Sequence, residues 1–112
     1  MAARTIVRLP PAVKVGETFE LTALIAHPME TGYRVDSEGK RLPRNILRRF
    51  RCQFEAPGAP PVLLFAADLH PAISANPYLA FSAVARASGQ LRLRWEGDAG
   101  FRHEETVALV VA

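Results

Sequence analysis

The chain has 112 residues, a length that fits one domain and leaves no room for two domains of ordinary size. Hydrophobic residues make up 49% of it, which is enough for a core, and no apolar run is long enough to span a bilayer. The net charge of +3 and the isoelectric point near 9.6 come mostly from arginine. This mild excess is weak support for nucleic-acid binding.

The first half of the chain predicts two strands and a long excursion. Residues 4–9 predict a short strand ended by Pro10-Pro11, and residues 15–17 predict a turn. From Thr18 to Ile25, apolar and polar side chains alternate, which is typical of a strand with one buried face. Residues 28–43 are rich in glycine and charge, and they predict a hairpin-like excursion that is poorly anchored except at its start.

The middle of the chain predicts a helical turn followed by two strands. Residues 45–48 predict one turn of helix capped by Asn45. Residues 49–54 alternate in polarity and predict a strand with one apolar face. Residues 62–69 are apolar on both faces, which predicts a buried central strand ended by His70-Pro71.

The last part of the chain predicts three more strands, over residues 79–86, 90–96 and 101–111, with short connections between them. Short strands at this spacing, with no helical periodicity over any long window, are typical of a β-sandwich. We therefore expect an all-β, immunoglobulin-like sandwich of about seven strands that forms a single domain over residues 1–112.

The single cysteine, Cys52, excludes an internal disulfide. It shares its strand face with Phe50 and Phe54, which favours burial in the core. A reactive thiol needs an exposed, electropositive setting instead.

A metal site is an alternative, because three histidines, Met29 and Cys52 are residue types that suit copper or zinc. The clustered spacings of such sites are missing, however. His27 and His70, each followed by proline, are more consistent with strand ends where the imidazole meets water or a carbonyl, and His103 is isolated. A stand-alone periplasmic sandwich that binds a metal or small ligand through Met29, a histidine and Cys52 stays open as a second hypothesis.

No nucleophile elbow, phosphate loop or dinucleotide fingerprint is present, so an independent enzyme is not expected. Basic residues crowd residues 34–51. They form either a patch that receives an acidic partner or a solvated, mobile surface. Nucleic-acid binding would need aromatic side chains between these basic residues, and the only one there is Phe50, which we assign to the core.

The most distinctive segment is His27-Pro28-Met29-Glu30-Thr31-Gly32-Tyr33-Arg34. It is either a structural loop in which Tyr33 covers the core edge or a recognition surface, and we favour recognition. Met29 and Tyr33 are adaptable contact residues, and Arg34 offers a planar donor fork to an oxyanion. The candidate site is therefore His27, Met29, Glu30, Tyr33 and Arg34. In a second segment, Asn76-Pro77 sets a structural turn, and we expect both Tyr78 and Phe81 to pack.

These two segments, together with Gly97-Asp98-Ala99-Gly100-Phe101, resemble the SoxZ family over nearly the whole chain. The resemblance implies the non-catalytic half of a SoxYZ heterodimer in bacterial thiosulfate oxidation, without cofactor, metal, nucleic acid or membrane. Its partner SoxY would carry the sulfur covalently on a cysteine near its own C-terminus, and other Sox enzymes would make transient contacts. This chain ends Ala108-Leu109-Val110-Val111-Ala112 without such a cysteine, so we expect it not to be the sulfur-bearing subunit.

The start of the chain, residues 1–7, has no basic region followed by an apolar core, so no secretory signal peptide is predicted. By composition alone, the expected location would be the cytoplasm. The resemblance implies a periplasmic protein without its own signal, exported together with SoxY.

Overall fold

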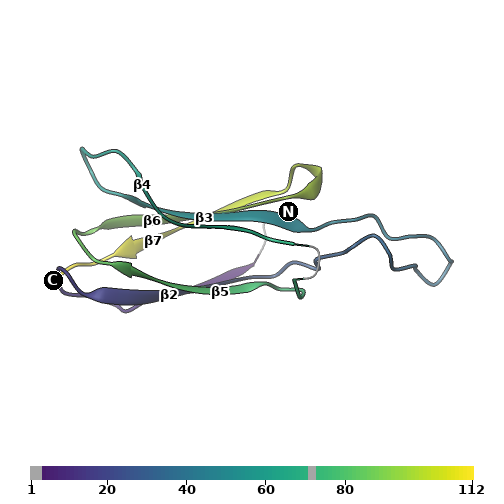
Figure 1. The fold of residues 1–112 in the computed structure, drawn as a ribbon, viewed down its shortest axis with the longest axis horizontal. Coiled ribbons are helices and arrows are strands. Elements are labelled where there is room, and N and C mark those ends of the chain that lie inside the picture. Colours follow the sequence, from purple (N-terminus) through teal and green to yellow (C-terminus); the bar gives the residue numbers. More distant parts are fainter. Residues whose placement is uncertain (1–3, 71–72) are drawn as a thin grey trace.

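The computed structural model describes residues 4–70 and 73–112, so the expected strand end at Pro71 and the start of the chain at residues 1–3 lie outside the described residues. Within the described residues, seven β-strands form two antiparallel sheets (Figure 1). One sheet has the order β1-β2-β5 and the other β4-β3-β6-β7. The predicted immunoglobulin-like sandwich is confirmed. The strands are β1 Thr5–Arg8, β2 Thr18–Ile25, β3 Leu47–Glu55, β4 Val62–Asp68, β5 Tyr78–Val84, β6 Gly89–Gly97 and β7 Arg102–Leu109.

The core forms where the alternating strands turn their apolar faces toward each other. Trp95 of β6, Phe50 of β3 and Leu21 of β2 are all at most 1% exposed. The rings of Phe50 and Trp95 lie 5.1 Å apart at a tilt of 60°. Burying one such side chain contributes roughly 1.5–3 kcal/mol to folding, so the alternation in the sequence is what fixes which face of each strand is inside.

The two sheets are unequal in width, and β4 lies beyond the edge of the narrower one. On one side of the sandwich, Thr5 of β1 donates a hydrogen bond of 2.7 Å to Glu105 of β7. On the other side, Phe81 of β5 contacts Phe50 of β3 and stacks on Phe65 of β4 with a centroid distance of 4.5 Å. Strand β5 therefore faces the boundary between β3 and β4.

The prediction of a central buried strand over residues 62–69 is wrong. Strand β4 pairs with β3 alone and is an edge strand. Val62 and Leu63 are 52% and 58% exposed. The apolar run indicated burial on both faces, but among the described residues no second strand pairs with β4.

Residues 28–45 form a segment that we call the projecting hairpin (Figure 1). At its base, Glu30 and Asn45 exchange two backbone N–H···O bonds of 2.7 Å. Further out, Val35 pairs with Arg41. The hairpin is thus anchored along both arms, not only at its start, and it contributes to a long molecule of 57 × 23 × 21 Å. The helical turn predicted at residues 45–48 is wrong, because Asn45 pairs with Glu30 and β3 begins at Leu47.

The secondary structure of the described residues offers no helix long and apolar enough to cross a membrane.

Candidate functional site at the base of the projecting hairpin

His27 is buried at the point where the chain leaves β2, with 3% of its surface exposed. Its Nδ1 accepts a 3.0 Å hydrogen bond from the backbone N–H of Met29, so the neutral ring carries its proton on Nε2. That Nε2 has no hydrogen-bond partner within the described residues. The ring stands edge-on to Phe101 at 5.3 Å. The expectation that this imidazole meets water or a carbonyl is wrong, because it caps the next turn of its own chain.

Burial lowers the pKa of His27 below its ordinary value, while Asn45 and the charge of Asp98 act in the opposite direction. The uncharged ring is the form that fits this site, since it accepts the Met29 N–H at Nδ1. A second proton would remove that acceptor and place a charge in the core. The site is built around a neutral imidazole.

Met29 is also buried, at 5% exposure, and it adopts a left-handed backbone with φ of 51°. This conformation is costly for a long side chain and persists only where the surroundings enforce it. Here the N–H of Met29 bonds to His27, and its Sδ accepts the N–H of Leu47 at 3.2 Å. Met29 therefore joins the two arms of the hairpin and offers no exposed contact surface to a partner.

Tyr33 and Arg34 form the exposed part of the predicted site, and the Glu30 side chain beside them is only 13% exposed. Arg34 lies beside Glu30, with Nη2 at 2.8 Å from Oε1 and Nε at 3.0 Å from the same oxygen. Tyr33 is 81% exposed and does not cover the core edge. Of the five predicted residues, His27, Met29 and Glu30 hold the base of the hairpin, and Tyr33 and Arg34 face outward along it.

Asp98 completes the base of the hairpin, although the sequence analysis did not include it among the candidate site residues. Its carboxylate lies 3.1 Å from Arg44 Nε and 2.6 Å from Arg48 Nε, and it also accepts the backbone N–H of Ile46 at 3.1 Å. These partners, above all Arg48, hold the pKa of Asp98 below its ordinary range. The only sequence signal was an acid in a turn of a chain whose arginines cluster elsewhere.

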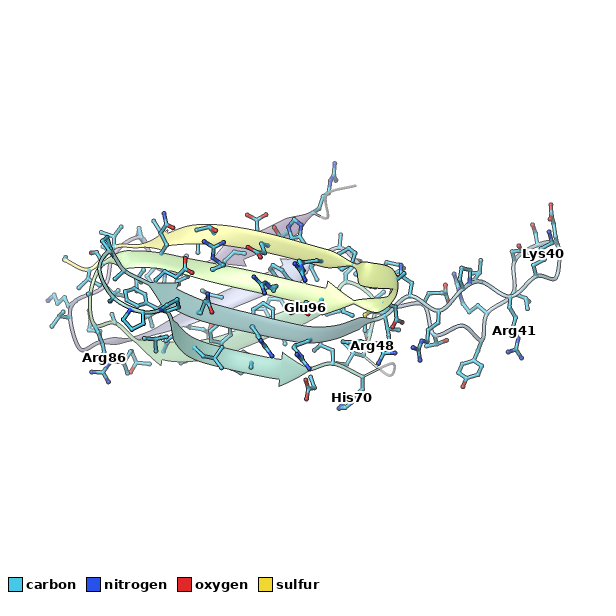
Figure 2. All side chains as sticks on the ribbon, turned by 90° about the horizontal axis from the view of Figure 1, so that it is seen from above. Lys40, Arg41, Arg48, His70, Arg86 and Glu96 are labelled. Atoms are coloured by element: carbon cyan, nitrogen blue, oxygen red, sulfur yellow. The ribbon has the colours of Figure 1, made fainter. Side chains whose placement is uncertain are left out.

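The basic residues of the 34–51 stretch do not form one patch. Arg44 and Arg48 face Asp98 at the hairpin base, and Arg49 lies 3.8 Å from Asp68. Arg51 belongs to a hollow on the outer face of the wider sheet, beside Arg94. Lys40 and Arg41 lie at the far end of the hairpin (Figure 2). The stretch is therefore divided among the base of the hairpin, the outer face of the wider sheet and the far end of the hairpin.

The predicted structural turn at Asn76-Pro77 faces the same base. Asn76 adopts a φ of 52° and exchanges two hydrogen bonds with the backbone of His27. Tyr78 is 61% exposed, so the expectation that it packs is wrong, whereas Phe81 is buried in the core as expected. The Tyr78 side chain points to the outer face of the narrower sheet, where it borders a shallow hollow.

The remaining metal-ligand candidates are scattered. Cys52 is fully buried in β3, and burial raises the pKa of its thiol to about 12. His103 lies 3.3 Å from Glu105 on β7, and His70 is exposed beyond β4. Within residues 4–70 and 73–112, no three side chains of His, Cys, Asp or Glu come together as metal ligands. His27 Nδ1 and Met29 Sδ each already accept a backbone N–H.

Solved structures share this fold at low sequence identity. The superoxide reductase (neelaredoxin) from Ignicoccus hospitalis has a TM-score of 0.75 and 19% identity, covering 98% of this chain and 82% of that one. A putative superoxide reductase from Thermotoga maritima has a TM-score of 0.75 and 14% identity, covering 96% and 85%. The sulfur carrier protein SoxY from Chlorobium limicola f thiosulfatophilum has a TM-score of 0.65 and 11% identity, covering 96% and 74%.

At these identities the similarities show the fold alone. No curated protein sequence matches the chain. The family model of the sulphur oxidation protein SoxZ, in contrast, matches residues 7–108. Because that match covers nearly the whole chain, this protein belongs to the SoxZ family and is a non-catalytic subunit of a sulfur-oxidising Sox system.

Proposed function

We propose that this chain is the scaffold subunit of a SoxYZ heterodimer in the periplasm, where its SoxY-like partner carries the sulfur intermediates of thiosulfate oxidation on a C-terminal cysteine. The observation that carries the proposal is the state of Cys52. It is the only thiol of this chain, it is fully buried, and burial raises its pKa to about 12. Because the thiolate is the form that bonds to sulfur, a SoxZ-family chain with such a thiol acts in sulfur transfer through a partner.

The projecting hairpin is the part of this chain that would present the partner's sulfur-bearing tail or contact the enzymes that act on it. Tyr33 and the Arg34 side chain are 81% and 71% exposed. Sulfonate and thiosulfonate groups are anionic, and a guanidinium is suited to bind them. Glu30 binds both Nε and Nη2 of Arg34, which fixes the direction of the guanidinium.

The first experiment is co-purification of the affinity-tagged chain from its native host grown on thiosulfate, followed by intact-mass measurement. The expected result is a stoichiometric SoxY-like partner that bears sulfur-containing mass additions. Recovery of the 12.3 kDa chain alone, or of the chain with bound copper or zinc, would contradict the proposal.

The second experiment tests the hairpin in reconstituted thiosulfate oxidation. Tyr33→Ala and Arg41→Glu change exposed positions of the hairpin, so both should slow turnover while the heterodimer stays intact. Lys14→Glu is the matched charge control, because Lys14 follows Val13, which pairs with Val111 at the opposite end of the sandwich (Figure 1). Equal turnover by the hairpin variants and the control would remove the hairpin from the proposed function.

A further inference from the structure

Within the described residues, the narrower sheet covers the inner face of β4 only in part. Phe81 of β5 already stacks on Phe65 of β4, so β5 is the last strand of the narrower sheet on this side. Toward the start of β4, Val62 is 52% exposed although its neighbour across the ladder is the inward-facing Phe54. The wider sheet therefore extends one strand further than the sheet that it packs against.

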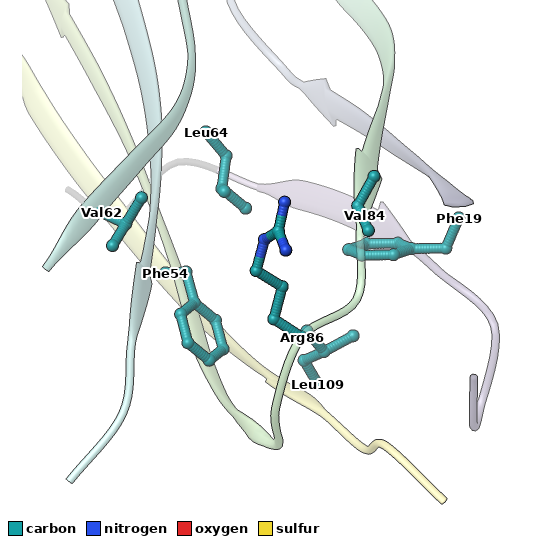
Figure 3. A pocket seen from close by; sticks show the side chains of 7 residues that line it. All are labelled: Phe19, Phe54, Val62, Leu64, Val84, Arg86 and Leu109. Atoms are coloured by element: carbon teal, nitrogen blue, oxygen red, sulfur yellow. The ribbon is translucent and has the colours of Figure 1, made fainter. Parts of the chain in front are cut away.

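This mismatch leaves an apolar hollow of about 160 Å³ between the sheets. Phe54, Val62 and Leu64 form one wall and Phe19 and Val84 the other (Figure 3). The single charged side chain of the lining is Arg86. It is the second residue after the end of β5, and its side chain extends between the walls (Figure 3). Arg86 forms no ion pair with any described residue, and an unpaired guanidinium beside apolar side chains is suited to receive a carboxylate.

The four sheet edges differ in how they are protected against pairing with another chain. Strand β1 is only four residues long, and β7 carries several charged side chains, with Glu105 bonded to Thr5. Strand β4 contains a bulge. The consecutive residues Cys52 and Gln53 of β3 pair with Phe65 and Leu63, so that Leu64 is an extra residue on β4. Short edges, charges and bulges are the usual protective devices.

Strand β5 has none of these devices. Its seven residues contain no charge and no proline, and they pair with β2 in unbroken register from Thr18–Val84 to Leu24–Tyr78. Its other side has no neighbouring strand among the described residues. Alternate N–H and C=O groups of such an edge point outward and form a template for one more antiparallel or parallel strand.

We propose that the SoxY-like partner supplies the missing strand: an extended segment adds to β5, places apolar side chains in the hollow, and pairs a carboxylate with Arg86. The inference rests on the proposed function for the identity of the partner. Backbone hydrogen bonds to β5 give affinity, and the hollow and Arg86 give specificity, as in other strand additions. A fourth strand at this position would also face β4 and remove Val62 from water.

Two neighbouring residues of β4 provide the test and its control. Val62 lines the hollow, whereas Leu63, similarly exposed, lies opposite Gln53 on the outer face. Val62→Glu places a charge where the partner's apolar side chains would lie, and it should weaken SoxY binding, measured by calorimetry, by about tenfold or more. Arg86→Glu should weaken it as well. Leu63→Glu should bind with the affinity of the parent chain. Thermal unfolding verifies that all three variants fold.

Hydrogen exchange provides a second readout. In the complex, backbone amides of β5 that exchange in the free chain should become protected, whereas those of β1 should not change. Parental affinity in both Val62→Glu and Arg86→Glu would overturn the inference while leaving the heterodimer intact. Unchanged hydrogen exchange of the β5 amides in the complex would also overturn the inference. So would a homodimer that pairs through β5 while SoxY binds at another surface. A parent chain that binds no SoxY would overturn the proposed function and this inference together.

Discussion

His27 and Asn76 bind each other through two hydrogen bonds across 49 residues of sequence. The N–H of His27 donates to Oδ1 of Asn76 at 2.8 Å, and the N–H of Asn76 donates to the carbonyl of His27 at 2.7 Å. The end of β2 is thus joined to the turn before β5. Because His27 also accepts the Met29 N–H, this pair connects the sandwich to the first arm of the projecting hairpin.

Asn76→Ala should lower the free energy of unfolding by about 1–3 kcal/mol, because it leaves the His27 N–H without its acceptor. The φ of 52° at this position adds to the loss, since alanine tolerates it less well than asparagine. Asn76→Gly removes the same acceptor but relieves the backbone. In urea unfolding, the free energy of unfolding should therefore be highest for the parent chain, lower for Asn76→Gly and lowest for Asn76→Ala. Equal stability of Gly and Ala would show that the backbone conformation plays no part.

Stability should fall as the pH drops below about 6.5, the ordinary pKa of histidine. Burial lowers the pKa of His27, so between its folded pKa and 6.5 the unfolded chain binds more protons than the folded chain. The stabilisation is complete above 6.5 and is lost toward lower pH, with a slope of at most about 1.4 kcal/mol per pH unit. Denaturant unfolding between pH 7.5 and 5 measures it.

The control is His27→Gln, which does not titrate and should give a flatter profile over this range, although it is less stable at pH 7.5. The carboxylates of Glu55, Asp98 and Glu104 have lowered pKa values as well, but their contributions are lost only as the pH falls below about 4.5. They therefore do not overlap with the histidine. An equally steep profile in His27→Gln would assign the acid sensitivity to another group.

The regular part of the fold could be predicted from the sequence because the alternation of apolar and polar side chains indicates which side chains are buried. Phe50 and Cys52 were placed in the core on this ground, and they are fully buried. No such alternation is present in β4, and a continuous apolar run cannot distinguish a central strand from an edge strand. Val62 and Leu63 of this edge strand are exposed.

The residues that the sequence singled out between His27 and Arg34 are neighbours along the chain, but the contacts that hold them come from distant segments. The distinctive residues between His27 and Arg34 do form one structure, the base and first arm of the projecting hairpin. Burial of Met29 depends on its left-handed backbone and on a bond from Leu47, which lies 18 residues away. Asp98 lies 50 residues from its partner Arg48 and 52 residues from Ile46. Contacts of this range leave no local signal in the sequence.

Cys52 should not react with a thiol reagent in the folded chain at pH 8. Its side chain is fully buried, and the raised pKa of about 12 leaves almost no thiolate. Ellman's reagent should therefore detect no thiol until denaturant is added and then one thiol per chain. Rapid reaction of the native protein, or an interchain disulfide on non-reducing gels of a correctly folded sample, would contradict the buried position.

Asp98 should control how firmly the projecting hairpin is held. Asp98→Asn keeps an oxygen for the Ile46 N–H but removes the charge that faces Arg44 and Arg48. Hydrogen exchange at the amides of Glu30 and Asn45, which bond to each other at the hairpin base, should then become faster. Asp68→Asn is the matched control, because Asp68 is an exposed acid whose arginine partner lies at 3.8 Å on the sandwich. In Asp68→Asn, the hydrogen-exchange rates of the Glu30 and Asn45 amides should equal those of the parent chain. If Asp98→Asn gave the same rates as well, the charge of Asp98 would play no part in holding the hairpin.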